Sequence, residues 1–420
     1  MRLASVASIL QLPPMVRAAL LGLIACCGPA LAADLSPLAA TATNALGADL
    51  LRREPNGANV VLSPYSIQLA LAMTFEGAGG ETRAQMKKAL HYGDADVGAA
   101  FAALNKSLAS MQARSETNQS RGGDPIALHV ASRLFGQKGI AFKKPFLELV
   151  ADKFGATLEP LDFAKDPAGA AEIINAWVAK QTSDRIRNLI PENATGSLTG
   201  LVLANAIYLK APWDAPFEKN GTQSQPFHLA DGKSVSVPTM IKSADVGYAK
   251  REGFAAISLP YAGGELRLLI LLPDAPDGLP ALEKNLDGKT LSGFAQLQPT
   301  RAKIHLPKLK IEPPSLNLND ALQALGMTDA FDARSANFDG ITPAGGPDAL
   351  HISDVFHKAF LSLDEQGTEA AAATAVIMMF RSAPPPEAPL ELRIDRPFLF
   401  AVQHTPSGAC LFLGRVADPR

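Results

Sequence analysis

The stretch DEQGTEAAAATAVIMMFRS, residues 364–382, joins a run of small residues to an apolar run that ends at Arg381. Alanine is the best helix former, and Thr368 followed by Glu369 is typical of a helix start, so the first interpretation is an ordinary helix. The end at Val376–Phe380 instead favours a buried strand. A third interpretation explains both halves at once, namely a loop that is able to become a strand.

The strand interpretation defines the two faces of the segment, because successive side chains of a strand point to opposite sides. Small or apolar residues without charge fall on one face, which holds Thr368, Ala370, Ala372, Thr374, Val376 and Met378. The other face holds Glu369, Ala371, Ala373, Ala375 and Ile377, and its one charge is free to remain in water. Gly367, which lacks a Cβ atom, provides a flexible hinge. The segment therefore has the composition that a strand needs to enter an existing sheet.

The pattern E-x-G-T-E-A-A-A-A-T at residues 365–374, followed later by Arg396-Pro397-Phe398, resembles the hinge and reactive-centre loop of serpins. The resemblance implies that the hinge consists of Glu365, Gly367, Thr368, Glu369, Ala370, Ala371, Ala372, Ala373 and Thr374. In the family the scissile bond lies at a near-fixed distance from the hinge glutamate, which implies Arg381 as the specificity residue and Ser382 on the leaving side. The segment after Arg381 is longer and richer in proline than in common members, so Phe380 remains an alternative specificity residue.

Further blocks of the sequence resemble the same family from about Thr41 to Pro419. They are S-P-Y-S-I-x-x-A-L-A-M from Ser63, I-I-N-A-W-V-A-K-Q-T from Ile173, the run Lys210–Phe217 and V-F-H-K-A-F from Val355. The resemblance implies a polar cluster beneath the main sheet, the shutter, formed by Ser63, Ser66, Asn205 and His357. It also implies that Trp213 marks the breach, where the loop begins to insert. Taken alone, His357 and Trp213 are typical of ordinary core residues.

The resemblance implies an α+β fold, the serpin fold, with three β-sheets, about eight or nine helices and an exposed reactive-centre loop at about residues 367–389. Residues 33–420 then form a single domain, although a length of 420 residues alone favours two or three domains. The hydrophobic fraction of 47% is enough for a substantial core. The residue pattern itself predicts a helix at Thr41–Arg53, a buried strand at Leu201–Leu209 and a long strand at Ile352–Leu363.

The N-terminus is typical of a secretion signal at residues 1–32. Two arginines precede the apolar run Ala18–Ala25, and Ala30-Leu31-Ala32 is a small-residue cleavage site. The apolar run is too short to span a membrane. We therefore expect a secreted, extracellular or periplasmic protein. An alternative is lipidation, because Leu23-Ile24-Ala25-Cys26 resembles a bacterial lipobox, which would place a lipid anchor at Cys26.

No pattern in the sequence indicates an enzyme or a cofactor. The motifs G-x-S-x-G, S-x-x-K, H-E-x-x-H and the P-loop are absent, and the 7 histidines lack the spacing of zinc ligands. The net charge of −2 gives no general attraction to nucleic acid or to anionic lipid. We expect no metal, no cofactor, no nucleic-acid partner and a monomeric protein.

The function that the resemblance implies is suicide inhibition of trypsin-like serine proteases. A protease attacks the bond between Arg381 and Ser382, and arginine suits a pocket with a buried carboxylate. Cleavage leaves an acyl-enzyme on Arg381, and the freed loop enters the main sheet from about Thr368 onward, which distorts the attached protease. The alternative is a non-inhibitory serpin that acts as a binding or carrier protein. An enzyme or a solute-binding protein would need a catalytic constellation or a pocket that the sequence does not show.

Overall fold

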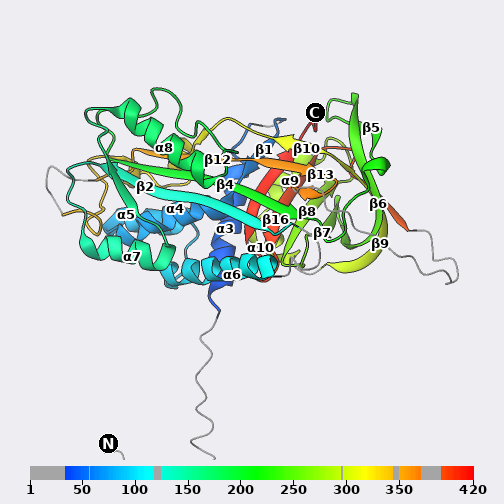
Figure 1. The fold of residues 1–420 in the computed structure, drawn as a ribbon, viewed down its shortest axis with the longest axis horizontal. Helices are drawn as coiled ribbons and strands as arrows, with labels where there is room; N and C mark the ends of the chain where they lie inside the picture. The colour runs from blue at the N-terminus through cyan, green and yellow to red at the C-terminus, as the bar shows by residue number, and fades with distance from the viewer. Residues whose placement is uncertain (1–33, 56, 118–123, 295–296, 344–349, 370–388) are drawn as a thin grey trace, which may run out of the picture. The chain divides into compact units, whose positions relative to one another are not determined.

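Strand β4 (Leu201–Pro212) lies inside an eight-stranded sheet and is buried along almost its whole length. Its sequence LVLANAIYLKAP is a nearly continuous apolar run, as a strand with both faces covered requires. Odd-numbered side chains such as Leu203 enter the main core, whereas even-numbered ones such as Tyr208 pack into a second core with α8 (Pro167–Gln181). Figure 1 shows α8 on one side of β4 and α4 (Pro64–Gly77) on the other.

The computed structural model describes residues 34–55, 57–117, 124–294, 297–343, 350–369 and 389–420, and Leu35–Arg420 forms one compact unit. Besides α4 and α8, the α-helices are α3 (Ser36–Leu51), α5 (Gly80–Ala89), α6 (Val97–Thr117), α7 (Lys144–Phe154), α9 (Leu279–Asn285), α10 (Gly288–Gly293) and α11 (Asn319–Ala324). The described residues thus hold nine α-helices, within the expected number. In this part of the chain, no helix has both the length and the apolar character to cross a membrane.

Hydrogen bonds join the strands of the described residues into two networks. The first has nine strands in the order β1-β17-β16-β8-β7-β6-β9-β15, with β5 beside β6. These strands are β1 (Val60–Leu62), β5 (Gln223–His228), β6 (Ser234–Arg251), β7 (Phe254–Pro260), β8 (Leu266–Pro273), β9 (Gln298–Pro307), β15 (Leu390–Arg393), β16 (Phe398–His404) and β17 (Cys410–Val416). The long β6 pairs with β5 at its start, with β9 along its middle and with β7 at its end. Divided at β6, this network supplies two of the three expected sheets.

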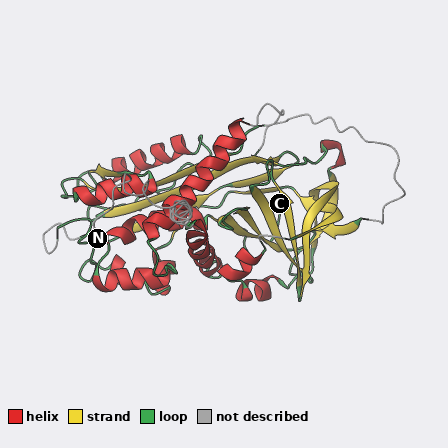
Figure 2. Ribbon diagram, turned by 90° about the horizontal axis from the view of Figure 1, so that it is seen from below, coloured by secondary structure: helices red, strands yellow, loops and turns green. Residues whose placement is uncertain are grey.

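The second network is the eight-stranded sheet that contains β4. Its other strands are β2 (Ala127–Gln137), β3 (Leu158–Leu161), β10 (Leu309–Ile311), β11 (Leu316–Asn317), β12 (Asp354–Ala359), β13 (Leu361–Asp364) and β14 (Gly367–Thr368). β12 runs parallel to β4 and pairs with it along its full length, whereas β13 is separated from β4 by β14. The sheet is therefore closed at one end of β4 and holds an additional short strand at the other. Figure 2 shows the long strands with helices on both sides.

Two local predictions need correction. The first helix begins at Ser36 rather than Thr41, because a proline is favourable in the first turn of a helix, where its missing N–H needs no partner. The strand predicted at Ile352–Leu363 is interrupted at Phe360, where the pairing partner changes from β4 to β14. The signal predicted at residues 1–32, with Cys26, lies outside the described residues.

Candidate functional site

The gap between β4 and β13 is already occupied by the start of the loop. After β13 the chain turns, and β14 returns between the two strands, with Thr368 opposite Leu363 on one side and Ala211 on the other. Thr368 is 1% exposed, and its hydroxyl lies 2.6 Å from the hydroxyl of Tyr261. The sequence-based expectation of an exposed loop from residue 367, with Thr368 entering the sheet only after cleavage, is therefore wrong.

The reason for this early insertion is that it satisfies backbone and side chain together. Beyond Ala359 the chain no longer pairs with β4, and without β14 both β4 and β13 would present unpaired edges to solvent. Thr368 is small, and Tyr261 provides a partner for its hydroxyl, so its burial leaves no polar atom unsatisfied.

Backbone geometry fixes where the inserted stretch begins and ends. Gly367 has a φ of +146°, and a Cβ atom there would lie 2.1 Å from the carbonyl oxygen of Ala211, so only glycine fits. Glu369 has a φ of +47°, a left-handed conformation that ends the extended backbone of β14, although its N–H still donates to the carbonyl oxygen of Ser362 at 3.1 Å. Its carboxylate pairs with Arg185 at 2.6 Å. Burial raises the pKa of Glu369, and Arg185 opposes that shift.

Trp213 lies beside the turn that leads into β14. Its indole N–H donates to the carbonyl oxygen of Asp364 at 3.0 Å, and its backbone N–H donates to that of Gln366 at 2.8 Å. The indole ring stacks on Tyr261, with the ring centroids 4.6 Å apart. The residue assigned to the breach thus contacts both the turn and the tyrosine that holds Thr368.

Glu365 anchors the same turn through its side chain. It is 6% exposed, its carboxylate pairs with Lys308 at 2.9 Å, and it accepts a hydrogen bond from the Thr222 hydroxyl at 2.6 Å. Burial acts to raise the pKa of Glu365, but the hydrogen bonds from Thr222 and Lys308 lower it below its ordinary value. Sequence reasoning missed Thr222, Tyr261 and Lys308, because they lie on separate elements and belong to no motif.

The four residues assigned to the shutter meet at the N-terminus of α4. Asn205 on β4 lies opposite His357 on the parallel β12, and His357 Nδ1 is 2.7 Å from Asn205 Oδ1. The backbone N–H of Ser63 donates to His357 Nε2 at 3.0 Å, and the Ser66 hydroxyl donates to Asn205 Oδ1 at 2.7 Å. All four residues are 0% exposed. Ser63 also caps α4, because its hydroxyl accepts from the Ser66 N–H at 3.2 Å.

These hydrogen bonds define the protonation state of His357. Its Nε2 accepts from a backbone N–H and therefore carries no proton, while its Nδ1 donates to the amide oxygen of Asn205. Burial lowers the pKa of His357 from its ordinary value of 6.5 to about 3, so the imidazole is neutral. Removing one partner would leave a buried polar group unpaired, at a cost of about 1–3 kcal/mol.

The structure places only part of the hinge that the sequence predicts. Glu365, Gly367, Thr368 and Glu369 lie as described above, at one end of β4. The other predicted loop residues lie outside the described residues, namely Ala370, Ala371, Ala372, Ala373, Thr374, Arg381 and Ser382. The scissile bond therefore stays a sequence-based prediction. The base of the loop lies in the same sheet as Asn205 and His357, which form a polar seam between β4 and β12, and Trp213 directly follows β4.

A sheet that admits the base of a loop as an additional strand, above a buried polar seam, is the arrangement expected of a serpin. The chain matches the family described as serpin (serine protease inhibitor) over residues 41–419. The leukocyte elastase inhibitor of Bos taurus is 37% identical over 379 residues, which cover 88% of this chain and 95% of the relative. Antithrombin-III of Mus musculus is 34% identical over 363 residues, which cover 86% and 76%.

Solved structures agree with this assignment. Uncleaved ovalbumin has a TM-score of 0.77 at 29% identity and covers 90% of this chain and 99% of its own. Native protease nexin-1 with heparin has a TM-score of 0.77 at 31% identity and covers 92% and 100%. The chain belongs to the serpin family, which confirms the predicted family and the α+β fold. Relatives named as inhibitors also agree with the prediction of a protease inhibitor rather than an enzyme.

The first prediction concerns the pH dependence of stability that His357 causes. The pKa of His357 is about 3 in the fold and 6.5 ordinarily, so below about pH 6.5 the unfolded chain binds a proton that the folded protein does not. Its contribution to stability is therefore present above pH 6.5 and is lost as the pH falls toward 3, by up to about 1.4 kcal/mol per pH unit. Chemical denaturation of wild type and His357→Gln between pH 7.5 and 4 measures this, and the wild type should lose more stability. Equal losses would mean that His357 has the same pKa in the fold as in the unfolded chain.

The second prediction concerns the backbone at Gly367. Gly367→Ala places a Cβ atom 2.1 Å from the Ala211 carbonyl oxygen, so β14 should leave the sheet. The strained conformation adds a cost of roughly 1–3 kcal/mol. Hydrogen exchange at the amides of Thr368 and Glu369 should become faster, and the Tm should fall. Gln366→Ala, one residue earlier in the same turn, is the matched control and should keep wild-type exchange. Unchanged protection in Gly367→Ala would show that β14 tolerates a side chain there.

Proposed function

We propose that this protein is an exported, monomeric inhibitor of trypsin-like serine proteases that traps its target by inserting the cleaved loop between β4 and β12. The observation that carries the proposal is the register of β14. Thr368 pairs with Ala211 on β4 and with Leu363 on β13. Ala211 and Leu363 are 152 residues apart in the sequence, as are Asn205 and His357, which pair directly where β4 and β12 are neighbours. β4 and β12 can therefore part without sliding, and a strand growing from Thr368 meets both in register.

In the inserted state that we propose, the rest of the loop continues this register. Because β14 is antiparallel to both neighbours, each later residue of the loop would pair with the preceding residue of β4 on one side. On the other side it would pair with the preceding residue of the segment that runs from β13 back to β12. Thr374 then falls between Asn205 and His357, where its hydroxyl replaces part of the hydrogen bonding that the seam loses. The alanines between Thr368 and Thr374 are small enough to pass under α8 and over the main core. The inserted strand also gains backbone hydrogen bonds along both of its edges.

The chemistry belongs to the protease, and the inhibitor supplies the movement. The protease serine attacks the carbonyl carbon of Arg381, the amine of Ser382 leaves, and an acyl-enzyme remains on Arg381. Insertion over roughly 13 residues at about 3.3 Å each carries the protease by about 40 Å. Trapping succeeds when insertion distorts the protease before water completes deacylation. The uncleaved state is then kinetically trapped, because the strand-inserted state is more stable.

The specificity and the location in this proposal rest on the sequence. Arginine at position 381 supports a trypsin-like target, and a scissile bond at Phe380 would instead favour a chymotrypsin-like one. The relative from Bos taurus is named for elastase, but the loop residue at the scissile bond sets the specificity of each inhibitor. Export rests on residues 1–32, with lipidation at Cys26 as the alternative to simple cleavage.

The third prediction tests the scissile bond. Arg381→Ala should abolish trapping of trypsin, because the protease pocket loses its cationic partner, while the Tm of the intact protein stays at the wild-type value. Arg381→Lys is the matched control and should still form a complex that survives denaturing electrophoresis. Clean cleavage of wild type without a complex would instead favour the binding or carrier protein. Persistence of the complex in Arg381→Ala would move the scissile bond to another residue.

The fourth prediction tests strand insertion itself. Thr368 is unsuitable for this purpose because it is already buried, so the substitution belongs at Thr374. Thr374→Arg would bring an unpaired charge between Asn205 and His357, at a cost of several kcal/mol. Insertion should slow while deacylation continues, so trypsin should cleave the variant as a substrate. Thr374→Val, which adds no charge, should still trap trypsin. Wild-type stoichiometry of inhibition by Thr374→Arg would exclude insertion in this register.

A further inference from the structure

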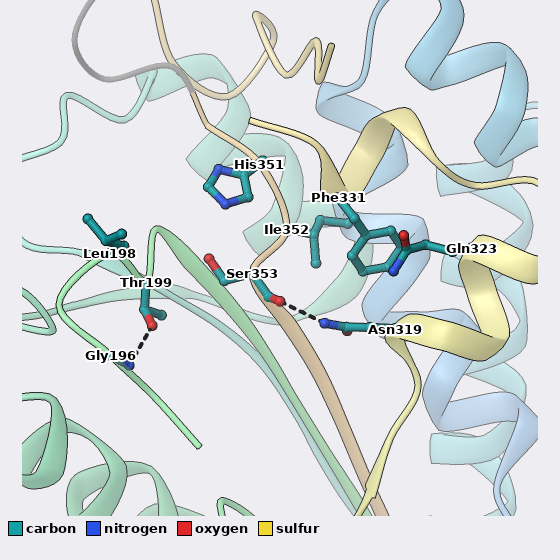
Figure 3. Close-up of a pocket in the computed structure, with 9 residues that line it drawn as sticks. All are labelled: Gly196, Leu198, Thr199, Asn319, Gln323, Phe331, His351, Ile352 and Ser353. Atoms are coloured by element: carbon teal, nitrogen blue, oxygen red, sulfur yellow. Dashed lines mark hydrogen bonds between the residues drawn. The ribbon is translucent and has the colours of Figure 1, made fainter. Parts of the chain in front are cut away.

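A cavity of about 310 Å³ lies at the foot of the eight-stranded sheet, at the end opposite to β14. In Figure 3 the segment with His351, Ile352 and Ser353 runs between Leu198 and Thr199 on one side and Phe331, Gln323 and Asn319 on the other. The walls of the cavity come from three parts of the chain. They are the segment before β4 (Gly196, Leu198, Thr199), the segment leading into β12 (His351, Ile352, Ser353), and α11 with the following turn (Asn319, Gln323, Phe331). The volume is at the lower end of the range for small-molecule sites and suits one side chain.

Asn319 and Ser353, two polar residues of the walls, are held by hydrogen bonds to each other and to neighbouring backbone groups. The Asn319 side-chain amide donates to the carbonyl oxygen of Ser353 at 2.8 Å, and its oxygen accepts from the Val355 N–H at 3.0 Å. The Ser353 hydroxyl accepts from the Gly200 N–H at 2.9 Å. Burial lowers the pKa of His351, with Asp332 acting against the shift, so this wall carries no charge at neutral pH. An occupant therefore needs no charge of its own.

Apolar surface is available at the same place. Phe331 contributes a partly exposed ring to the lining, whereas Ile352 is fully buried. Leu198 at the rim is 90% exposed, an unusual state for a leucine beside a buried strand. Burial of apolar surface is favourable at about 25 cal/mol per Å², so an apolar or aromatic side chain that covers Leu198 is stabilised at this rim. These observations describe the chemistry of the occupant without identifying it.

The register of β14 identifies the occupant. Continued from Thr368, it places Met378 between Leu201 and Ser353, where β4 and β12 begin. The next residue on the same side of the loop is Phe380, two residues further on. It reaches the level of Thr199 and His351, and both of these residues line the cavity.

We propose that the cavity at the foot of the sheet is the docking site of the Phe380 side chain in the cleaved, inserted loop. The proposal rests on the proposed function, since docking occurs only if the loop inserts. The phenyl ring covers the exposed side chain of Leu198 and the exposed part of Phe331, and an aromatic pair adds to the free energy of area burial. Phe380 thereby acts as a positioning residue that secures the last stage of insertion, in addition to its place beside the scissile bond.

Docking also explains how the foot of the sheet opens. Ser353 closes the seam there, because its N–H donates to the carbonyl oxygen of Leu201 at 3.0 Å and its hydroxyl accepts from Gly200. The inserted loop must replace both bonds, and Met378 arrives between these residues in the same register. Anchoring of Phe380 just beyond that point holds the exchanged bonds in place while the protease is still attached.

The fifth prediction compares Phe380→Ala with Met379→Ala, because the register puts Met379 on the opposite side of the loop. Intact proteins of both variants should have the wild-type Tm. After cleavage by trypsin, the Tm of Phe380→Ala should rise less than that of wild type. Its stoichiometry of inhibition, the number of inhibitor molecules used per trapped protease, should be higher. Met379→Ala should match the wild type in both measurements. Equal behaviour of the two variants would overturn the docking of Phe380.

A second pair of variants tests the cavity rather than the loop. Gln323→Trp fills the cavity from α11 and should reduce the Tm gain on cleavage, and adding Phe380→Ala should cause little further loss, since both changes remove one contact. Asp320→Trp, on an exposed position of the same helix, is the control and should have no effect. Independent, additive losses from Gln323→Trp and Phe380→Ala would place Phe380 elsewhere. Absence of both a covalent complex and a Tm gain in wild type would overturn the proposed function itself, which these variants do not test.

Discussion

The hydrogen bond between His357 and Asn205 crosses the seam between β4 and β12, and the remainder of the site depends on it. It joins two parallel strands at the level where Ser63 and Ser66 attach the N-terminus of α4 to both. Because all four residues are fully buried, each polar atom needs a partner inside the protein. Hydrogen bonds of this kind can be exchanged for others of equal quality, whereas interdigitated apolar side chains would have to be pulled apart. The hydrogen bonds can therefore hold β4 and β12 together and still be replaced by bonds to another strand.

The two ends of the seam are closed in different ways. At one end the chain itself supplies β14, which is held by Tyr261, Trp213 and the Lys308–Glu365 pair. At the other end Ser353 bonds directly to the segment before β4, and a cavity lies beyond it. The sheet thus holds the short strand β14 at one end of the seam and lies beside a cavity at the other. Between these ends Asp354–Ala359 pairs with β4, and the proposed insertion would separate this stretch.

Much of this arrangement was predictable from the sequence, and the limits have physical causes. The run Leu201–Leu209 predicts a buried strand, and a lone asparagine inside it predicts a polar partner. The partner is His357, 152 residues away, which only the family resemblance indicated. Gly367 was predicted as a flexible hinge, but its φ is fixed because the Ala211 carbonyl leaves no room for a side chain. Burial of Thr368 depends on Tyr261, 107 residues away, and no local pattern reports such a contact.

The chain has 2 tryptophans, one directly after β4 and one in α8. Trp213 stacks on Tyr261 and bonds to the turn before β14, while Trp177 in α8 lies under the guanidinium of Arg133, whose Cζ is 4.5 Å from the indole ring centroid. Indole emission depends on such neighbours. Departure of the hinge from the sheet thus changes the surroundings of Trp213, and displacement of α8 changes those of Trp177. With Trp177 replaced by phenylalanine, Trp213 is a spectroscopic reporter on the turn before β14, where the proposed insertion would continue.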